Sequence, residues 1–148
     1  MGDVRTAGTT NHFGDLVDNI GKFVGNRVLH VTLNVFDALI DGTPRTTGTG
    51  TPVDTGTLRA NWNIGIRPTS SYIERIKGSQ LPKPTPNIKS YGTHYTYYLW
   101  NNSPYLNYVN DGIIWRGAKT DNSRQNINFV QKAIDVGIQN ANASWNSI

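Results

Sequence analysis

The sequence predicts an α+β fold, a small mostly antiparallel sheet packed with a long N-terminal helix and a C-terminal helix. Apolar residues recur every three or four positions near both ends of the chain, and they alternate with polar residues in its middle. Aromatic residues cluster in one later segment, which is typical of a strand. At 148 residues the chain is expected to form a single domain, 1–148.

The N-terminal helix is predicted to follow a polar leader of residues 1–12. Its apolar face comprises Phe13, Leu16, Ile20, Val24, Val28, Val31, Val35 and Leu39. Gly21 and Gly25 indicate either a close neighbour or a bend. A helix over 13–40 would be about 42 Å long. Since this exceeds the needs of a small core, we expect the helix to contact something besides its own sheet.

Two loops or flexible arms are predicted. Gly42 and Pro44 end the helix, and residues 42–56 have no hydrophobic periodicity. In the second loop, over 78–90, prolines at alternate positions remove the amide donors that a helix or central strand needs. Both segments are of the kind that becomes ordered on contact with a neighbour.

A half-buried strand is predicted from Thr57 to Arg67 because polar and apolar residues alternate strictly. Its inward residues would be Leu58, Ala60, Trp62, Ile64 and Ile66. The segment 72–77 is the predicted hairpin partner. Ahead of the strand, the Asp54 side chain is expected to bond to amides farther along and Gly56 to permit a left-handed turn.

Residues 91–100 are predicted to form a third strand. Its two faces would be Tyr95, Tyr97 and Leu99 against His94, Tyr98 and Trp100, so both faces should be covered. The strand is expected to end at residues 101–104, and a helical turn over 105–109 to close at Asp111 and Gly112.

The chain is predicted to finish in an amphipathic helix. Asn122 is the expected N-cap, with Gln125 three residues later. The expected apolar face comprises Ile127, Val130, Ile134, Ile138, Ala141 and Trp145.

Composition and motifs favour a protein without catalytic function. The absence of cysteine excludes disulfides and thiol chemistry. Neither an export signal nor a membrane-spanning stretch is recognisable, so we expect an aqueous location. His12, His30 and His94 lack the spacing of metal ligands, and neither a metal nor a cofactor is expected.

Two alternatives remain open at this point. A nucleic-acid-binding module is suggested by the aromatic strand and by a net charge of +4, to which the segment 43–92 contributes a basic excess. More remotely, Asp54-Thr55-Gly56 is the tripeptide of retropepsin-like aspartic proteases. Against the protease, Pro52 stands where that family has an apolar strand, and Ile64-Gly65 is too close to serve as its second signature.

The segment Thr51-Pro-Val-Asp-Thr-Gly-Thr-Leu-Arg-Ala-Asn-Trp62 resembles a signature of tailed-phage tail components known as neck, tail-completion or head-tail joining proteins. The resemblance continues over 97–105 and 108–112. Many members carry a Glu where this chain has Asn110, so a salt bridge from that position is not expected. The fold determinants that the resemblance implies are Pro52, Asp54, Gly56, Leu58, Trp62, Asn101, Pro104, Tyr105 and Gly112.

This resemblance implies a structural virion protein, made in the host bacterial cytoplasm, that forms a six- or twelvefold ring in the neck at the head-tail junction. The implied partners are portal-side connector proteins, tail terminator or tube proteins, and viral DNA in the channel. No membrane partner is implied. The candidate inter-subunit arms carry Arg45, Thr49, Leu81, Pro82, Pro84 and Pro86. Arg59 and Arg67 are candidate contacts for DNA or an acidic partner.

Overall fold

The computed structural model describes residues 2–41, 50–51, 56–74, 81–86, 88, 94–111 and 128–145, with side chains from residue 13 onward. Its elements are α1 (Gly2–Asp41), α2 (Thr57–Ala60), β1 (Trp62–Gly65), β2 (Tyr98–Asn101), α3 (Leu106–Asn110) and α5 (Phe129–Ser144). Two long helices with a small antiparallel sheet confirm the predicted α+β class.

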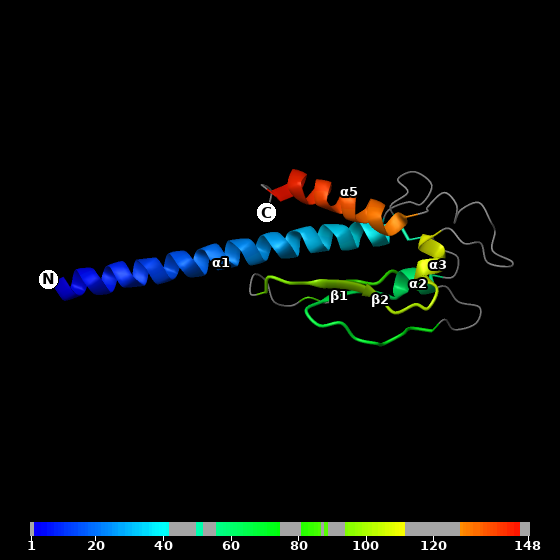
Figure 1. The fold of residues 1–148 in the computed structure, drawn as a ribbon, viewed down its shortest axis with the longest axis horizontal. Helices are drawn as coiled ribbons and strands as arrows, with labels where there is room; N and C mark the ends of the chain where they lie inside the picture. The colour runs from blue at the N-terminus through cyan, green and yellow to red at the C-terminus, as the bar shows by residue number, and fades with distance from the viewer. Residues whose placement is uncertain are drawn as a thin grey trace.

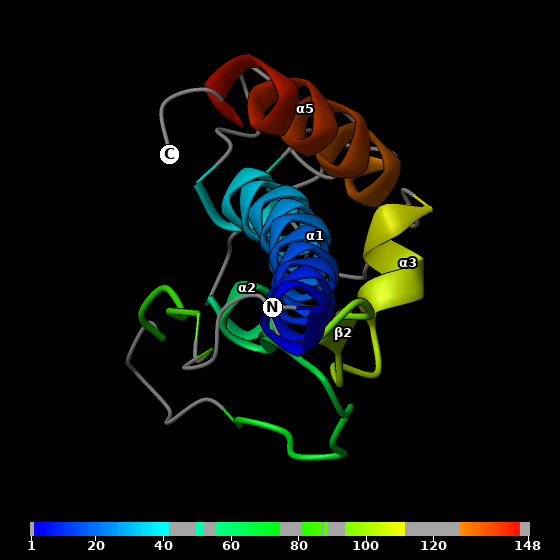
Figure 2. The same cartoon turned by 90° about the vertical axis from the view of Figure 1, so that its left-hand side faces the viewer.

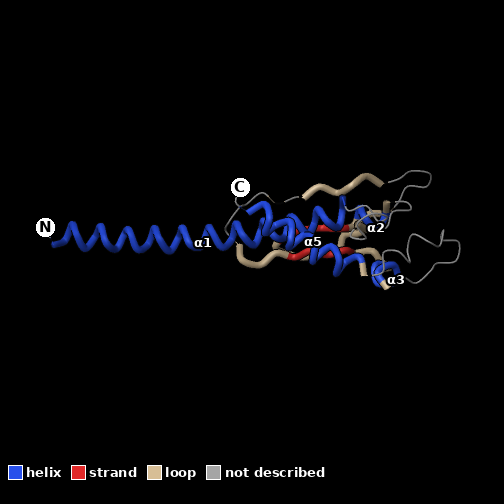
Figure 3. Tube along the Cα trace, turned by 90° about the horizontal axis from the view of Figure 1, so that it is seen from above, coloured by secondary structure: helices blue, strands red, loops and turns tan. Residues whose placement is uncertain are grey.

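Helix α1 is the axis of the molecule. The sheet lies along one side of its C-terminal half and α5 along the other (Figure 1). An end-on view shows α5 and β2 on opposite sides of α1 (Figure 2). Viewed from above, the N-terminal part of α1 projects beyond the other described elements (Figure 3). Only the C-terminal half of this helix therefore has the rest of the domain around it.

The predicted start of α1 near Phe13 was too late, because the helix begins at Gly2. Residues 2–12 are polar but contain no proline, and extending an existing helix costs far less than starting one. The predicted end is confirmed, since α1 finishes at Asp41.

The core lies where α1, β1 and α5 meet. Its largest fully buried apolar side chains are Phe36 and Leu39 from α1 and Phe129 from α5. Trp62 and Ile64 of β1 complete it from the sheet side. Burying each such side chain stabilises the fold by roughly 1.5–3 kcal/mol.

Small residues let α5 approach α1 closely. Its buried positions are Phe129, Ala133, Gly137 and Ala141. A Cβ placed on Gly137 would lie 2.5 Å from the Val35 Cα, so the two backbones almost touch. The predicted apolar face was therefore only partly right: Ala141 is buried, but Ile138 is exposed. The predicted cap at Asn122 lies outside the described residues, and the observed helix begins after Asn128.

The predicted strand from Thr57 to Arg67 is wrong in its first part. Thr57–Ala60 forms a helical turn, and only Trp62–Gly65 is a strand. Thr57, expected to face solvent, is therefore buried. Ile66, expected to face the core, lies after the end of the strand and is exposed. In a strand, successive side chains point to opposite faces, whereas in a helix they point to the same face only every 3.6 residues. The alternation therefore does not predict which side chains of the helical turn are buried.

The predicted hairpin with 72–77 is also wrong over the residues described. β1 instead pairs antiparallel with β2, with Trp62 opposite Asn101 and Gly65 opposite Tyr98. The Asn61 side chain takes the place of a strand for Ile73: its Nδ2 donates to the Ile73 carbonyl at 3.0 Å, and its Oδ1 accepts from the Ile73 amide at 2.8 Å. One amide side chain thus satisfies a backbone that was expected to join a ladder.

The aromatic strand is shorter than predicted, since β2 begins at Tyr98 and 94–97 has no regular structure. Tyr95 and Tyr98 are exposed in the single described chain. The expected cover of both faces, in which a neighbouring subunit was one candidate, stays a prediction. The strand ends at Asn101 as predicted, and the helical turn that follows is α3.

Candidate functional site: the motif segments

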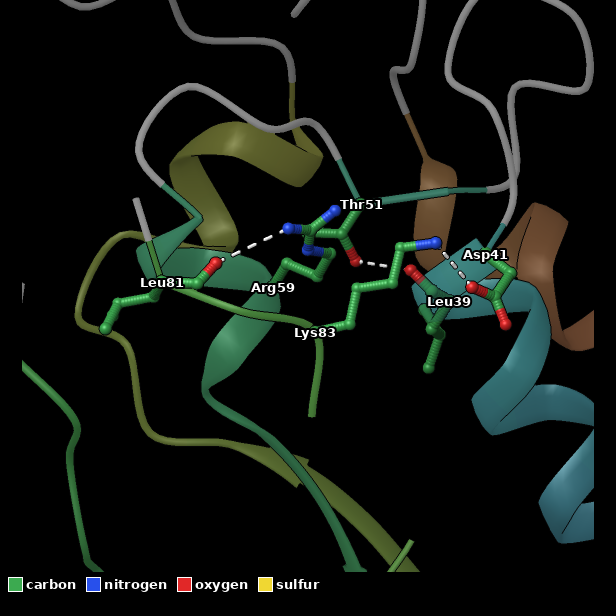
Figure 4. A network of polar contacts seen from close by, with 6 residues as sticks. All are labelled: Leu39, Asp41, Thr51, Arg59, Leu81 and Lys83. Atoms are coloured by element: carbon green, nitrogen blue, oxygen red, sulfur yellow. Dashed lines mark hydrogen bonds and ion pairs between the residues drawn. The ribbon is translucent and has the colours of Figure 1, made fainter. Parts of the chain in front are cut away.

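Thr51, the first residue of the phage-like signature, fastens the end of α1 to the sheet. Its backbone amide and its hydroxyl both donate to the Leu39 carbonyl at 2.9 Å (Figure 4). The hydroxyl also accepts from the Trp62 Nε1 at 2.8 Å. Thr51 thereby satisfies a carbonyl of the last turn of α1, which has no partner within the helix, together with a buried indole.

Gly56 has the left-handed conformation that was predicted for it, with φ of 80°. Its carbonyl accepts from the Ala60 amide at 2.8 Å, which starts the turn α2. Leu58 and Trp62 are buried, as expected of fold determinants. Pro52 and Asp54 lie outside the described residues, so the expected Asp54 bonds and the protease alternative both stay predictions.

Asn101 joins the two segments that carry the resemblance. Its Nδ2 donates to the Leu58 carbonyl at 2.8 Å, and its Oδ1 accepts from the Ser103 amide at 2.9 Å. Because Asn101 also lies opposite Trp62 in the sheet register, the signature around 51–62 and the later segment around 97–105 form one unit.

The later segment continues into a surface turn. Pro104 is exposed at its start, and Tyr105 is half-buried. The hydroxyls of Tyr105 and Tyr72 share a hydrogen bond of 2.6 Å, which raises the pKa of Tyr72 to about 12. The pair fixes the segment after β1 against the turn after β2. Gly112 lies outside the described residues.

Asn110, from which no salt bridge was expected, caps the final helix. Its Oδ1 accepts from the Val130 amide at 3.1 Å, and its carbonyl accepts from the Asn128 amide at 2.7 Å. These amides belong to the start of α5 and have no partner within that helix. A neutral amide therefore links α3 to α5 without a salt bridge.

The second predicted arm begins against its own domain. The Leu81 carbonyl accepts from Arg59 Nη2 at 3.4 Å, and Lys83 forms an ion pair with Asp41 at 2.7 Å (Figure 4). Residues 81–86 form neither helix nor strand, as predicted. Pro82 and Pro86 are exposed and Pro84 is half-buried.

The remaining candidate contact residues differ in how far their side chains are exposed to solvent. Arg67 is exposed, whereas Arg59 is half-buried and its guanidinium points to the Leu81 carbonyl. Of the two proposed cationic contacts, Arg67 is thus the one open to solvent. Arg45 and Thr49, assigned to the first arm, lie outside the described residues.

Sequence reasoning missed three polar anchors, namely Thr51, Asn61 and Asn110. Thr51 and Asn61 are among the most deeply buried side chains, although both residue types are usually exposed. The available signal was position: Thr51 opens the signature, and Asn61 directly precedes its tryptophan. Their partners, however, are mostly backbone groups that a sequence pattern does not reveal.

Comparison with known proteins gives no relative. No protein-family model, curated protein or solved structure matches the chain. In the part of the chain that the structure describes, no helix is long and apolar enough to cross a membrane. Nor, among the same residues, do three His, Cys, Asp or Glu side chains gather as metal ligands would.

Proposed function

We propose that this chain is a structural virion protein of a tailed phage, a neck subunit that assembles into a ring at the head-tail junction. One observation carries the proposal: the two segments that resemble the neck family meet in space. Asn101 bonds to the Leu58 carbonyl, and β1 pairs with β2. Two segments that are separate in sequence and that both resemble the neck family thus form one folded unit. If either resemblance were a chance match, the two segments would have no reason to meet.

The surface of the described chain supports a role in assembly. Six apolar side chains on the N-terminal half of α1 and several tyrosines on the sheet side are exposed. Exposed apolar patches of this extent mark interaction sites in soluble proteins. A neck subunit contacts its neighbours in the ring as well as the proteins above and below it, so it needs several such surfaces.

The proposal assigns the remaining roles as follows. Connector proteins on the portal side and tail terminator or tube proteins flank the ring, whose copy number is six or twelve. Viral DNA passes through the channel. Arg67, which is exposed, is the candidate contact for DNA or an acidic partner. Arg59 and Lys83 hold the second arm, whose exposed prolines Pro82 and Pro86 remain candidate contacts with a neighbour.

Electron microscopy of purified particles tests the proposal. Density for a ring that fits α1, the sheet and α5 should appear between capsid and tail, with a copy number that quantitative mass spectrometry of the same particles reproduces. Absence of the chain from purified particles would refute the proposal. In that event, binding of the isolated chain to single-stranded DNA, weakening steeply with salt, would point to the nucleic-acid alternative.

Point substitutions test the second arm better than deletion does. Removing residues 81–89 also removes the Lys83 ion pair and the acceptor of Arg59, so it changes the fold together with the surface. Replacing exposed Pro82 and Pro86 by serine changes the surface and leaves the groups of both contacts in place. If the arm contacts a neighbour, this double variant should form fewer rings than wild type at equal monomer stability. Rings at the wild-type level would remove these prolines from the interface.

A further inference from the structure

The N-terminal half of α1 has an uncovered apolar side. The side chains concerned are between 43% and 68% exposed, and they are Phe13, Leu16, Val17, Ile20, Phe23 and Val24. We call these six residues the N-terminal stripe. At 100° per residue they span roughly 120° of the helix circumference, the width of a face that a soluble helix normally buries.

The N-terminal stripe continues a surface that is already a helix interface. Trp145, at the end of α5, contacts Phe23 edge to face with ring centroids 5.4 Å apart. The same indole lies 4.5 Å beneath the Arg27 guanidinium and 5.6 Å from the His30 ring. Phe23, Arg27 and His30 thus belong to the side of α1 that α5 covers.

The same side of α1 continues past the end of α5. Steps of three or four residues from Phe23 toward the N-terminus reach Ile20, Leu16 and Phe13, the spacing of a packed helix seam. Trp145, which directly follows α5, contacts Phe23, and α5 stops partway along α1 (Figure 1). The seam residues Phe13, Leu16 and Ile20 are each more than half exposed. Geometrically, another helix would fit along the seam.

The charged residues beside the N-terminal stripe indicate which class of partner the stripe fits. The exposed charged residues between Phe13 and Val24 are Asp15, Asp18 and Lys22, and all three lie on the side opposite the stripe. Helices that lie on membranes carry basic polar faces, and nucleic acids attract basic surfaces. Here the acidic residues outnumber the basic one. The surface therefore suits an apolar protein helix better than a phosphate-bearing partner.

Area indicates a second copy of this chain. With about 150–250 Å² for a large aromatic side chain and somewhat less for an aliphatic one, the stripe exposes on the order of 600 Å². Two copies packed stripe to stripe would bury about 1,200 Å², the lower bound for a specific interface. One stripe against a small polar surface would fall below that bound.

We propose that the N-terminal stripe is the surface through which one copy of this chain packs against the stripe of a second copy. The inference deepens the proposed neck function and rests on it for the biological role of the association. Because each stripe meets an identical stripe, the contact is two-fold: it joins subunits in pairs, or one ring to another, and leaves the contacts between neighbours within a ring to other surfaces such as the two loops.

Sedimentation or light scattering of the full chain between about 1 and 100 µM tests the pairing. Wild-type protein should associate as concentration rises. Ile20→Asp places a charge inside the apolar contact and should raise the dissociation constant at least about 100-fold. Asn19→Asp is the matched control, since it adds the same charge at an exposed position outside the stripe. It should associate like wild type.

Folding is monitored in parallel by circular dichroism and chemical unfolding, in which both variants should resemble monomeric wild type because neither position belongs to the core. A wild-type chain that stays monomeric throughout would overturn the inference. So would Ile20→Asp protein that associates like wild type. If the wild-type chain forms the ring in particles while isolated Ile20→Asp protein associates like wild type, the pairing fails and the neck function survives. Self-association through the stripe, with the chain absent from particles, supports the pairing and refutes the neck function.

Discussion

The two halves of α1 have the same amphipathic pattern, but the apolar side of the C-terminal half is buried and that of the N-terminal half is exposed. In the C-terminal half, apolar residues such as Phe36 are buried between α5 and the sheet, and Phe36 itself is only 1% exposed. In the N-terminal half, Phe13 is 68% exposed. Periodicity predicts that a helix has an apolar side, but it does not reveal whether the partner belongs to the same chain. The length of the helix is the sequence feature that predicts a contact beyond the sheet, and an external contact stays a prediction.

The largest expected contrast is between these two phenylalanines. Phe36→Ala should lower the free energy of unfolding by about 3–5 kcal/mol, because it removes a fully buried ring and leaves a cavity. Phe13→Ala should change it by less than about 0.5 kcal/mol in the monomer. Denaturant unfolding at low protein concentration measures both. Equal losses would mean that the N-terminal half is packed within the monomer and would end the comparison.

Two glycines sharpen the same contrast. Gly137→Ala would set a Cβ 2.5 Å from the Val35 Cα, so α5 must move away from α1, at a cost of about 1–3 kcal/mol. A Cβ added to Gly14 would meet no atom within 4 Å, so Gly14→Ala should favour the helix by about 1 kcal/mol. Unfolding measures the first change, and hydrogen exchange of amides in the N-terminal half measures the second. A destabilising Gly14→Ala would show that this half is already in close contact.

The fastening of the C-terminal end of α1 can be tested separately. Thr51→Val keeps the side-chain shape but leaves the Trp62 indole buried without its acceptor, and should cost about 1–3 kcal/mol. Thr32→Val is the control, because its hydroxyl donates to the Val28 carbonyl one turn earlier in the same helix. If the two substitutions cost the same, the link from α1 to the sheet contributes no stability beyond an ordinary hydroxyl bond.

How far the sequence predicts this molecule follows from the range of each interaction. The end of α1, the left-handed Gly56 and the turn after Asn101 depend on neighbouring residues, and all three were predicted correctly. The pairing of β1 with β2 was not, because Asn61 satisfies Ile73 with a side chain that resembles any surface asparagine in sequence. The hydrophobic pattern of the sequence identifies which residues alternate between polar and apolar. Which two strands pair depends on contacts between residues that are distant in the chain.

The buried face of α5 was missed for a related reason. Hydrophobic periodicity weights large residues such as Ile138, yet a very close approach to α1 occurs at Gly137. Small residues carry little hydrophobic signal although they decide how near two helices can lie. The candidate site shows the same limit, because Thr51 and Asn110 gained roles only through carbonyls and amides far along the chain.

The smallest expected effect comes from charge at the C-terminal end of α1. Asp37 is partly desolvated and lies near Asp41, and both influences raise its pKa above the usual value. When the pKa of a carboxyl is higher in the folded state than in the unfolded state, the free energy of unfolding falls as pH rises through the folded-state pKa. The reason is that the folded protein then holds an unfavourable charge. Negative charge in the last turns also opposes the helix dipole.

Asp37→Asn removes this cost and should stabilise the protein at neutral pH by a few tenths of a kcal/mol. The gain should vanish in acid, where the wild-type carboxyl is protonated as well. Paired unfolding curves near pH 7 and below the ordinary aspartate pKa of 3.8 measure it. Asp18→Asn, at an exposed position in the N-terminal half, is the matched control because it removes the same charge. An equal gain from Asp18→Asn would assign the effect to net charge and not to the environment that sets the two halves of α1 apart.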